Sequence, residues 1–129
     1  MLSLAEQQLF ERSKRPLFSL GTTGSTVRAQ AVNASCGDEI EIALTIENAV
    51  VTQALHHSRG CAVSTASADL LCESLIGATV ELAAHFDHQK LLEAIGIQLS
   101  PARLKCALLP LEALRKGLDL LPKESPLVG

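Results

Sequence analysis

Residues 39–47 alternate between the two faces of an extended chain, and this stretch restricts the fold more than any other. Ile40, Ile42, Leu44 and Ile46 fall on one face, while three glutamates fall on the other. Because successive side chains of a β-strand point to opposite faces, the pattern predicts a strand with one buried and one solvated face. Such a strand needs a sheet with a hydrophobic layer on one side.

Two further strands are predicted beside this one. The chain reads as extended at residues 27–32 and again at residues 50–56. A tight turn at residues 47–49 joins the last two strands, and so short a connection predicts an antiparallel hairpin. The strand region is therefore expected to form a small three-stranded antiparallel sheet.

Helix signals flank the sheet in the sequence. Before it, Ser3 and Glu6 have the spacing of a capping box, so a helix of about ten residues starts there and ends before Pro16. After it, residues 64–77 read as a helix that stops at Gly77, a residue type common at helix C-termini. The chain thus begins with a helix and returns to helices after the strands.

Asp69 and Glu73 lie four residues apart in the 64–77 helix, and we expect both to mark its solvent-exposed side. Cys72 lies well inside the same helix, and a rise of about 1.5 Å per residue separates it from Cys61 by more than about 10 Å. A four-coordinate site that includes both cysteines would require the helix to break. Cys72 is therefore assigned to packing, where a free thiol behaves as a small hydrophobic group.

Three helix starts are predicted in the last third of the chain. Asp87 is expected to cap the second of two short helices, at residues 79–86 and 88–95. The Ser-Pro pair at residues 100–101 is a helix-start signal. Pro110 is expected to begin a separate last helix with a stripe of leucines.

The order of these elements predicts an α+β fold. Strands followed by helices favour a three-stranded antiparallel sheet with several helices packed on one face, preceded by an N-terminal helix. We expect a single domain whose parts are an N-terminal helix and loop, a sheet region and a helical region, followed by a loose tail. The domain is expected to span residues 1–121 and the tail residues 122–129. Within the domain, the N-terminal helix and loop take residues 1–26, the sheet region residues 27–59 and the helical region residues 61–121.

Composition argues against several classes of function. The net charge is −3 with scattered basic residues, and three phenylalanines and four histidines cannot line a base-stacking groove, so nucleic-acid binding is not expected. No apolar run reaches the length of a membrane span, and Glu6 and Glu11 interrupt the N-terminal apolar residues, which argues against a signal peptide. We expect a soluble cytoplasmic protein.

Its four cysteines are then core fillers, ligands or nucleophiles rather than structural disulfides.

Three of the cysteines fall at the ends of predicted elements, where side chains can converge on one edge of a sheet. Cys36 precedes the second strand, Cys61 follows the third, and Cys106 lies between two short helices. Asp38 points the same way as Cys36 in an extended chain, and Gly37 lets the backbone bend close to an ion. Three thiolates and a carboxylate suit zinc or an iron–sulfur cluster. Judged from spacing alone, scattered cysteines are more often buried thiols, and the Gly-Asp pair can be an ordinary turn.

Three segments of the chain resemble one family. "NASCGDEIEIALTI" resembles the N-P-x-C-G-D-x-[IV] segment of the IscU/SufU type of iron–sulfur cluster assembly proteins, which are related to the N-terminal part of NifU. "RGCAVSTASADLL" and "SPARLKCALLPLEAL" are similar to two further segments of that family, G-C-x-[IS]-x-x-A-S-x-S and P-x-R-x-K-C-A-x-L. The matches follow the family's order over residues 27–118. The resemblance implies a three-stranded sheet with helices packed against it.

The resemblance also implies a ligand set and a function. Cys36, Asp38, Cys61 and Cys106 take the positions that hold a zinc ion or a transient [2Fe–2S] cluster in that family. There a cysteine desulfurase delivers sulfur as persulfide to one of the cysteines, for which Cys106 and Cys36 are the candidates here. The implied protein is a scaffold that passes its cluster to acceptor proteins and is not an enzyme in the ordinary sense. Its oligomeric state stays open.

Departures from the family motifs leave a second version of this function open. Lys105 precedes the third ligand cysteine as in the SufU branch, where the IscU branch has histidine. The segment from Cys61 to Cys106, however, has the short IscU-like length without the SufU insertion. The L-P-P-V-K motif read by the IscU chaperone appears only as "LSPARLK", and the N-terminal motif only as "RSKRPLF". The alternative to a scaffold is a zinc-dependent sulfurtransferase that relays persulfide sulfur.

Lys105 and Arg103 are candidate supporting residues. An ammonium group beside Cys106 would favour its thiolate form, which is useful for ligation and for accepting sulfur. Arg103 is a candidate partner of Asp38 when a metal is absent or moves. The alternative for both is an ordinary solvated side chain on a helix surface.

His85 and His88 are separated by the expected cap at Asp87, and at most one of His56 and His57 points inward, so surface positions are expected for the histidines. One rival function is a structural or interaction module without a metal. Another is a cysteine hydrolase, which is disfavoured because none of the three cysteines has a histidine close by in sequence.

Overall fold

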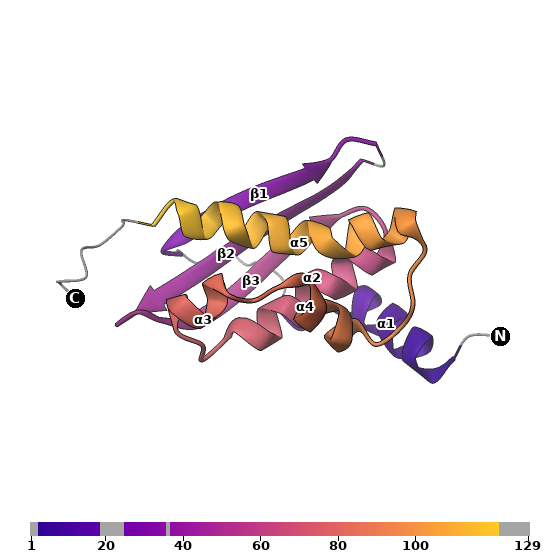
Figure 1. Ribbon diagram of the computed structural model, residues 1–129, viewed down its shortest axis with the longest axis horizontal. Coiled ribbons are helices and arrows are strands. Elements are labelled where there is room, and N and C mark those ends of the chain that lie inside the picture. The colour runs from indigo at the N-terminus through magenta and orange to yellow at the C-terminus, as the bar shows by residue number, and fades with distance from the viewer. Residues whose placement is uncertain (1–2, 19–24, 36, 122–129) are drawn as a thin grey trace.

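Three antiparallel strands form one sheet in the order β1–β2–β3, so the alternating stretch is its central strand (Figure 1). The structure, a computed structural model, describes residues 3–18, 25–35 and 37–121. The strands are β1 Val27–Asn33, β2 Asp38–Glu47 and β3 Val50–Arg59. The predicted sheet is confirmed, and each strand runs beyond the range read from the sequence.

Both hairpin turns contain residues in the left-handed backbone region. The β2–β3 turn consists of Asn48 and Ala49, with φ of 53° and 62°, the two-residue type that suits the twist of antiparallel strands. In the β1–β2 turn, Gly37 has φ of 79° and donates its N–H to the carbonyl of Asn33 at 2.8 Å. Since Asn33 pairs with Asp38 in the sheet, this turn sets Asp38 at the first position of β2.

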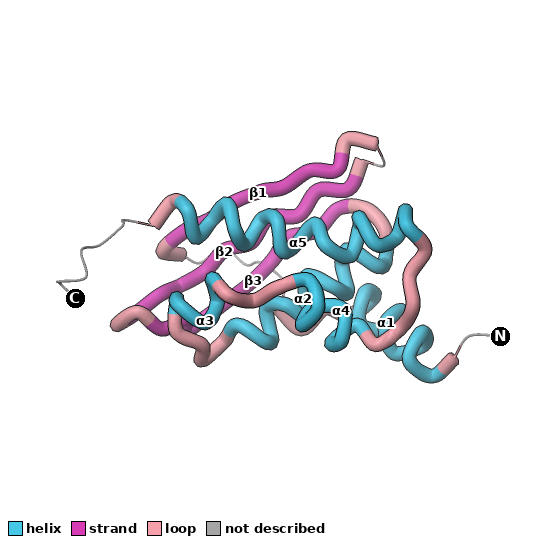
Figure 2. The backbone as a smooth tube through the Cα atoms, in the orientation of Figure 1, coloured by secondary structure: helices cyan, strands magenta, loops and turns pink. Residues whose placement is uncertain are grey.

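Helices pack against one face of the sheet (Figure 1, Figure 2). They are α1 Leu4–Lys14, α2 Ala62–Leu75, α3 Val80–Ala84, α4 His88–Ile95 and α5 Pro101–Asp119. The longest, α5, packs on β1 and β2, while α2 packs on β3 and α5, and α1 packs on α2. This confirms the α+β prediction. Within the described ranges, no helix combines the length and apolarity needed to cross a membrane.

The core lies between the sheet and helices α2 and α5 and contains aliphatic side chains. Ile40, Ile42 and Leu44 of β2 are at most 2% exposed, which accounts for the alternation of this strand. They belong to the same cluster as Leu71 of α2 and Leu114 of α5. Full burial of such a side chain stabilises the fold by roughly 1.5–3 kcal/mol.

Pro110 does not begin a separate helix, and that prediction is wrong. Helix α5 runs without interruption from Pro101 to Asp119 with Pro110 inside it. Proline has no N–H, so residue 110 cannot make the helical hydrogen bond to the carbonyl of Cys106. Apolar packing along the whole of α5 outweighs this local cost, because most helical stability in proteins comes from tertiary contacts. The predicted start at Ser100 is confirmed, since its hydroxyl caps the helix.

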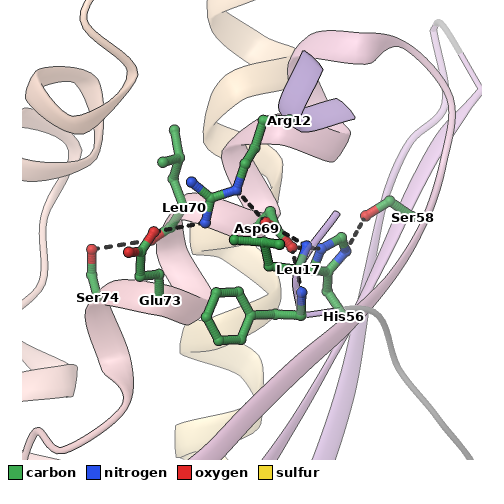
Figure 3. A network of polar contacts seen from close by, with 9 residues as sticks. Arg12, Leu17, His56, Ser58, Asp69, Leu70, Glu73 and Ser74 are labelled. Atoms are coloured by element: carbon green, nitrogen blue, oxygen red, sulfur yellow. Dashed lines mark hydrogen bonds and ion pairs between the residues drawn. The ribbon is translucent and has the colours of Figure 1, made fainter. Parts of the chain in front are cut away.

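Asp69 is fully buried, so the prediction that it marks the solvent side of α2 is wrong. Its carboxylate accepts hydrogen bonds from the Nε of Arg12, the backbone N–H groups of Leu17 and Phe18, and the ring of His56 (Figure 3). The last three are 3.0, 2.8 and 2.9 Å long. A charged group is buried only where such partners replace water, and here they tie α1 and residues 17–18 to α2 and β3.

Arg12 also binds the exposed Glu73 at 2.6 Å, which confirms the solvent position predicted for Glu73. Burial alone raises the pKa of a carboxyl group, but the hydrogen bonds, led by the one from Arg12, hold the pKa of Asp69 below its ordinary value. The anionic form is therefore the stable one in the folded chain.

His56 is only 2% exposed, which corrects the prediction of a surface histidine. Burial lowers the pKa of His56 and outweighs the opposite effect of its bond to Asp69. The neutral ring then donates from Nε2 to Asp69, and its Nδ1 accepts from the hydroxyl of Ser58 at 2.8 Å. Its neighbour His57 is exposed, as are His85 and His88.

Candidate metal site

Three of the predicted ligands meet at one end of the sheet. Asp38, Cys61 and Cys106 each offer a ligand atom, and these atoms all lie within 4.8 Å of one another. They come from the start of β2, the residue before α2 and the second turn of α5. The fourth predicted ligand, Cys36, lies outside the described residues.

Asp38 is the buried anchor of this cluster. Its side chain is 2% exposed, and its Oδ1 accepts a hydrogen bond from the backbone N–H of Cys61 at 3.1 Å. The thiol of Cys61 donates to Oδ2 of the same carboxylate at 3.4 Å. The two residues are therefore held together directly, before any metal is considered.

Gly60 makes room for this carboxylate, a role that the sequence analysis missed. A Cβ at Gly60 would lie 2.0 Å from Oδ1 of Asp38 and 2.5 Å from its Cγ. The φ of Gly60 is +137°, a conformation that other residues rarely adopt. The sequence contained a signal for this role, because the family segment "RGCAVSTASADLL" has a glycine directly before its cysteine. The physical reason for that glycine is the contact with Asp38.

Cys61 is the N-cap residue of α2. Its sulfur accepts a hydrogen bond from the backbone N–H of Ser64 at 3.5 Å, as the side chain of a capping residue normally does. The hydroxyl of Ser64 donates to the carbonyl of Cys61 at 3.0 Å, and Ser64 is fully buried. Cys61 is partly exposed whereas Asp38 and Cys106 are buried, so Cys61 is the most exposed of these three ligands.

Cys106 lies within a continuous helix and not in a break between two helices, which corrects the prediction. It is 7% exposed, and the helix that carries it packs on the sheet and on α2. Lys105 and Arg103 are exposed, and consecutive residues of a helix do not face the same way. In the described part of the chain, no ion pair joins Arg103 to Asp38, and an influence of Lys105 on Cys106 stays a prediction.

The donor set fits a zinc ion. Zinc binds thiolates at about 2.3 Å with tetrahedral geometry, which sets sulfur–sulfur separations of about 3.8 Å. That separation falls inside the 4.8 Å limit of this cluster. Two thiolates and one carboxylate leave a fourth position for a further ligand, and the same donor types can hold an iron–sulfur cluster.

Cys72 is kept apart from this cluster. It is fully buried in α2 and belongs to the hydrophobic core. Burial raises the pKa of the Cys72 thiol, so the thiol stays protonated and acts as an apolar group. This agrees with its assignment to packing.

The chain resembles proteins of known family in sequence. Residues 7–125 match the family model described as the NifU-like N terminal domain. The "Iron-sulfur cluster assembly scaffold protein IscU" of Thermotoga maritima is 36% identical in an alignment that covers 77% of this chain and 81% of that protein. The "Zinc-dependent sulfurtransferase SufU" of Bacillus subtilis is 28% identical in an alignment that covers 89% of this chain and 89% of that protein.

Solved structures share the fold. The crystal structure of FiSufU from the thermophile Fervidobacterium islandicum AW-1 has a TM-score of 0.74 and 24% identity, covering 91% of this chain and 96% of that chain. A NifU-like protein (N-terminal) from Brucella abortus has a TM-score of 0.68 and 20% identity, covering 88% of this chain and 90% of that chain. At these identities the likeness supports the fold alone.

Proposed function

The chain belongs to the NifU-like N-terminal domain family, and we propose that it is an iron–sulfur cluster assembly scaffold. The observation that carries the proposal is the convergence of Asp38, Cys61 and Cys106 within 4.8 Å at a partly exposed position. Cys36 is proposed as the fourth ligand, because it lies two residues before Asp38 in the chain. The cluster is cargo, so the protein has to hold it and then release it.

The mixed ligand set suits temporary binding. Thiolates are soft ligands that favour iron and zinc, whereas the carboxylate of Asp38 is a harder ligand. Asp38 also has an alternative partner, since its carboxylate accepts two hydrogen bonds from Cys61 when no metal lies between them. The carboxylate can therefore leave an ion without becoming an unpaired buried charge. This property supports a site that opens for transfer.

Sulfur is proposed to arrive from a cysteine desulfurase as a persulfide. A thiolate of this chain attacks the outer sulfur, a new S–S bond forms to the attacking cysteine, and the desulfurase cysteine leaves as a thiolate. Cys106 and Cys36 are the proposed acceptors. Cys106 is 7% exposed and Cys61 is partly exposed, so the proposed approach of the incoming persulfide is from the side of Cys61.

A zinc-dependent sulfurtransferase is the second candidate function. It is favoured by the residue before Cys106, which is Lys105 as in the SufU branch, and by the likeness to the Bacillus subtilis protein along 89% of this chain. In this version zinc is bound by Asp38, Cys61, Cys106 and Cys36 and keeps the thiols deprotonated. One cysteine then accepts persulfide sulfur and passes it on.

The two functions are separated by anaerobic purification followed by reconstitution. Zinc and iron per chain are measured first, and the protein is then incubated with cysteine, ferrous iron, a cysteine desulfurase and dithiothreitol, the reductant that converts persulfide sulfur to sulfide. A scaffold assembles a cluster with visible absorbance and transfers it to an apo acceptor protein. A sulfurtransferase instead retains zinc and accelerates the desulfurase without forming a cluster.

A matched pair of variants makes this experiment specific to the site. Cys61→Ser should abolish metal or cluster binding, whereas Cys72→Ala should retain it, since Cys72 lies in the core away from the cluster. Wild-type protein that binds neither zinc nor a cluster would overturn the proposal. So would Cys61→Ser protein that binds as the wild type does.

A further inference from the structure

One buried hydrogen bond connects the two helices that carry the cysteines of the site. The hydroxyl of Ser67 in α2 donates to the carbonyl of Ala107 in α5 at 2.6 Å. Both residues are fully buried, so no water competes for either group. Ala107 directly follows Cys106, and its carbonyl therefore moves with the turn of α5 that carries the Cys106 thiol.

This turn of α5 lacks one bond of a regular helix. A helical carbonyl accepts from the N–H four residues later, but for Cys106 that residue is Pro110, which has no N–H. Helix α5 therefore has one backbone hydrogen bond fewer at this turn. The bond from Ser67 to the next carbonyl supplies a constraint from outside the helix.

The other end of this connection leads to Cys61. Ser67 lies in the second turn of α2, and Cys61 is the N-cap of the same helix. Asp38 is in turn bound directly to Cys61 by its two hydrogen bonds. Asp38 and Cys61 thus form one unit that is continuous with α2, while Cys106 belongs to another helix.

We propose that Ser67 is a positioning residue for Cys106. Through the carbonyl of Ala107, it keeps the Cys106 thiol at ligand distance from Cys61 and Asp38, including when the cargo has left. The inference rests on the proposed function, in which these side chains are ligands. Partners that orient metal ligands typically change metal affinity by about 10–100-fold when they are removed.

Helix α2 contains a matched control serine. The hydroxyl of Ser74 also donates to a backbone carbonyl, that of Leu70 at 3.0 Å, but this bond stays within α2 and is exposed. Ser67→Ala and Ser74→Ala therefore remove the same chemical group from the same helix. Only the first removes a connection between the two cysteine-bearing helices.

The test is anaerobic titration of the full-length metal-free protein with Co²⁺, whose charge-transfer and ligand-field absorption report thiolate ligation and tetrahedral geometry. Thermal unfolding is measured beside it. Ser67→Ala is expected to bind Co²⁺ about 10-fold more weakly, with weakened tetrahedral bands. Ser74→Ala is expected to match the wild type in affinity and spectrum. A Ser67→Ala protein that melts lower but binds Co²⁺ with wild-type affinity and spectrum would show a merely structural role and overturn the proposal.

A second pair decides the question if Ser67→Ala does not fold. Ser67→Thr keeps the hydroxyl group. Ser67→Val gives a side chain of the same shape as threonine, with a methyl group in place of that hydroxyl. The proposal expects tighter Co²⁺ binding by the threonine variant, and equal binding by the two would overturn it. Wild-type protein that gives no Co²⁺–thiolate absorption would instead overturn the proposed function itself, together with this inference.

Discussion

The carboxylate of Asp38 occupies the space that a side chain at Gly60 would need, with only 2.0 Å between Oδ1 and the position of a Cβ. Gly60 and Cys61 are consecutive, so the same two residues make room for the carboxylate and donate a backbone hydrogen bond to it. The carboxylate cannot shift freely, since Asp38 is 2% exposed. The geometry of the candidate metal site therefore depends on a residue without a side chain.

Gly60→Ala is expected to displace Asp38 and to abolish tight zinc binding. The φ of +137° adds backbone strain, and strained positions of this kind cost about 1–3 kcal/mol. Metal content after purification and urea unfolding of the metal-free protein measure the two effects. Gly77→Ala is the control, because Gly77 has φ of +90° but nothing within 4 Å of its Cβ position. It should lose stability yet keep its metal, and equal metal loss in both variants would contradict the steric explanation.

Removal of bound metal should lower the melting temperature only where the site is intact. A ligand at about 1,000 times its dissociation constant stabilises the folded state by about 4 kcal/mol. Treatment of zinc-loaded wild type with a chelator is therefore expected to lower its melting temperature, as followed by circular dichroism. Cys61→Ser should melt at the same temperature with and without chelator. Cys72→Ala should start lower, because it leaves a cavity in the core, but should still respond as the wild type does.

Replacing Arg12 by glutamine should destabilise the fold strongly. Arg12 is the cation that pairs with the fully buried Asp69, and removing one partner of a buried pair costs about 3–5 kcal/mol; because the Arg12 side chain is 20% exposed, the lower end is expected. Urea unfolding measures the difference. Arg28→Gln is the matched control, since Arg28 pairs with Glu41 at 3.6 Å on an exposed strand face, where such pairs contribute about 0–1 kcal/mol. Similar losses in the two variants would contradict the role assigned to Arg12.

Stability should fall as the pH drops below the ordinary histidine value of 6.5. The folded-state pKa of His56 is lowered, so the unfolded chain takes up its proton first, and the stability present above pH 6.5 is lost as the pH falls toward the folded pKa. For one proton the slope is at most about 1.4 kcal/mol per pH unit. Asp69 changes the stability in the same direction at lower pH. Its contribution is present above its ordinary pKa of 3.8 and is lost as the pH falls through the lowered pKa of the folded chain.

Urea unfolding of metal-free protein between pH 8 and pH 5 measures this effect without competition from metal ligands. His56→Gln should remove most of the change between pH 7 and pH 5. His57→Gln, on the exposed neighbour, should change it only slightly, because His57 is one of the smaller causes that lower the pKa of His56. A pH profile that persists in the His56 variant would assign the effect to another group.

Local patterns in the sequence were sufficient for most elements of this fold. Alternation along β2, the capping box at Ser3 and the caps at Asp87 and Ser100 depend on residues a few positions apart, and the structure has each of them. The candidate ligands Asp38 and Cys61 were also found from the sequence, because their segments resemble those of a family. What these signals share is that they operate within a short stretch of chain.

Tertiary structure alone decided the features that require atoms from distant segments. The sequence by itself determined that Asp69 sits on a helix, but its burial depends on Arg12, which lies 57 residues away. Pro110 was read as a helix start, yet packing of α5 on the sheet and on α2 carries the helix through it. The role of Gly60 appears only where Asp38, from another strand, fills the space beside it. Local propensities amount to fractions of a kcal/mol per residue, whereas burial and charge pairing reach several kcal/mol per residue, so the assembled core overrides them.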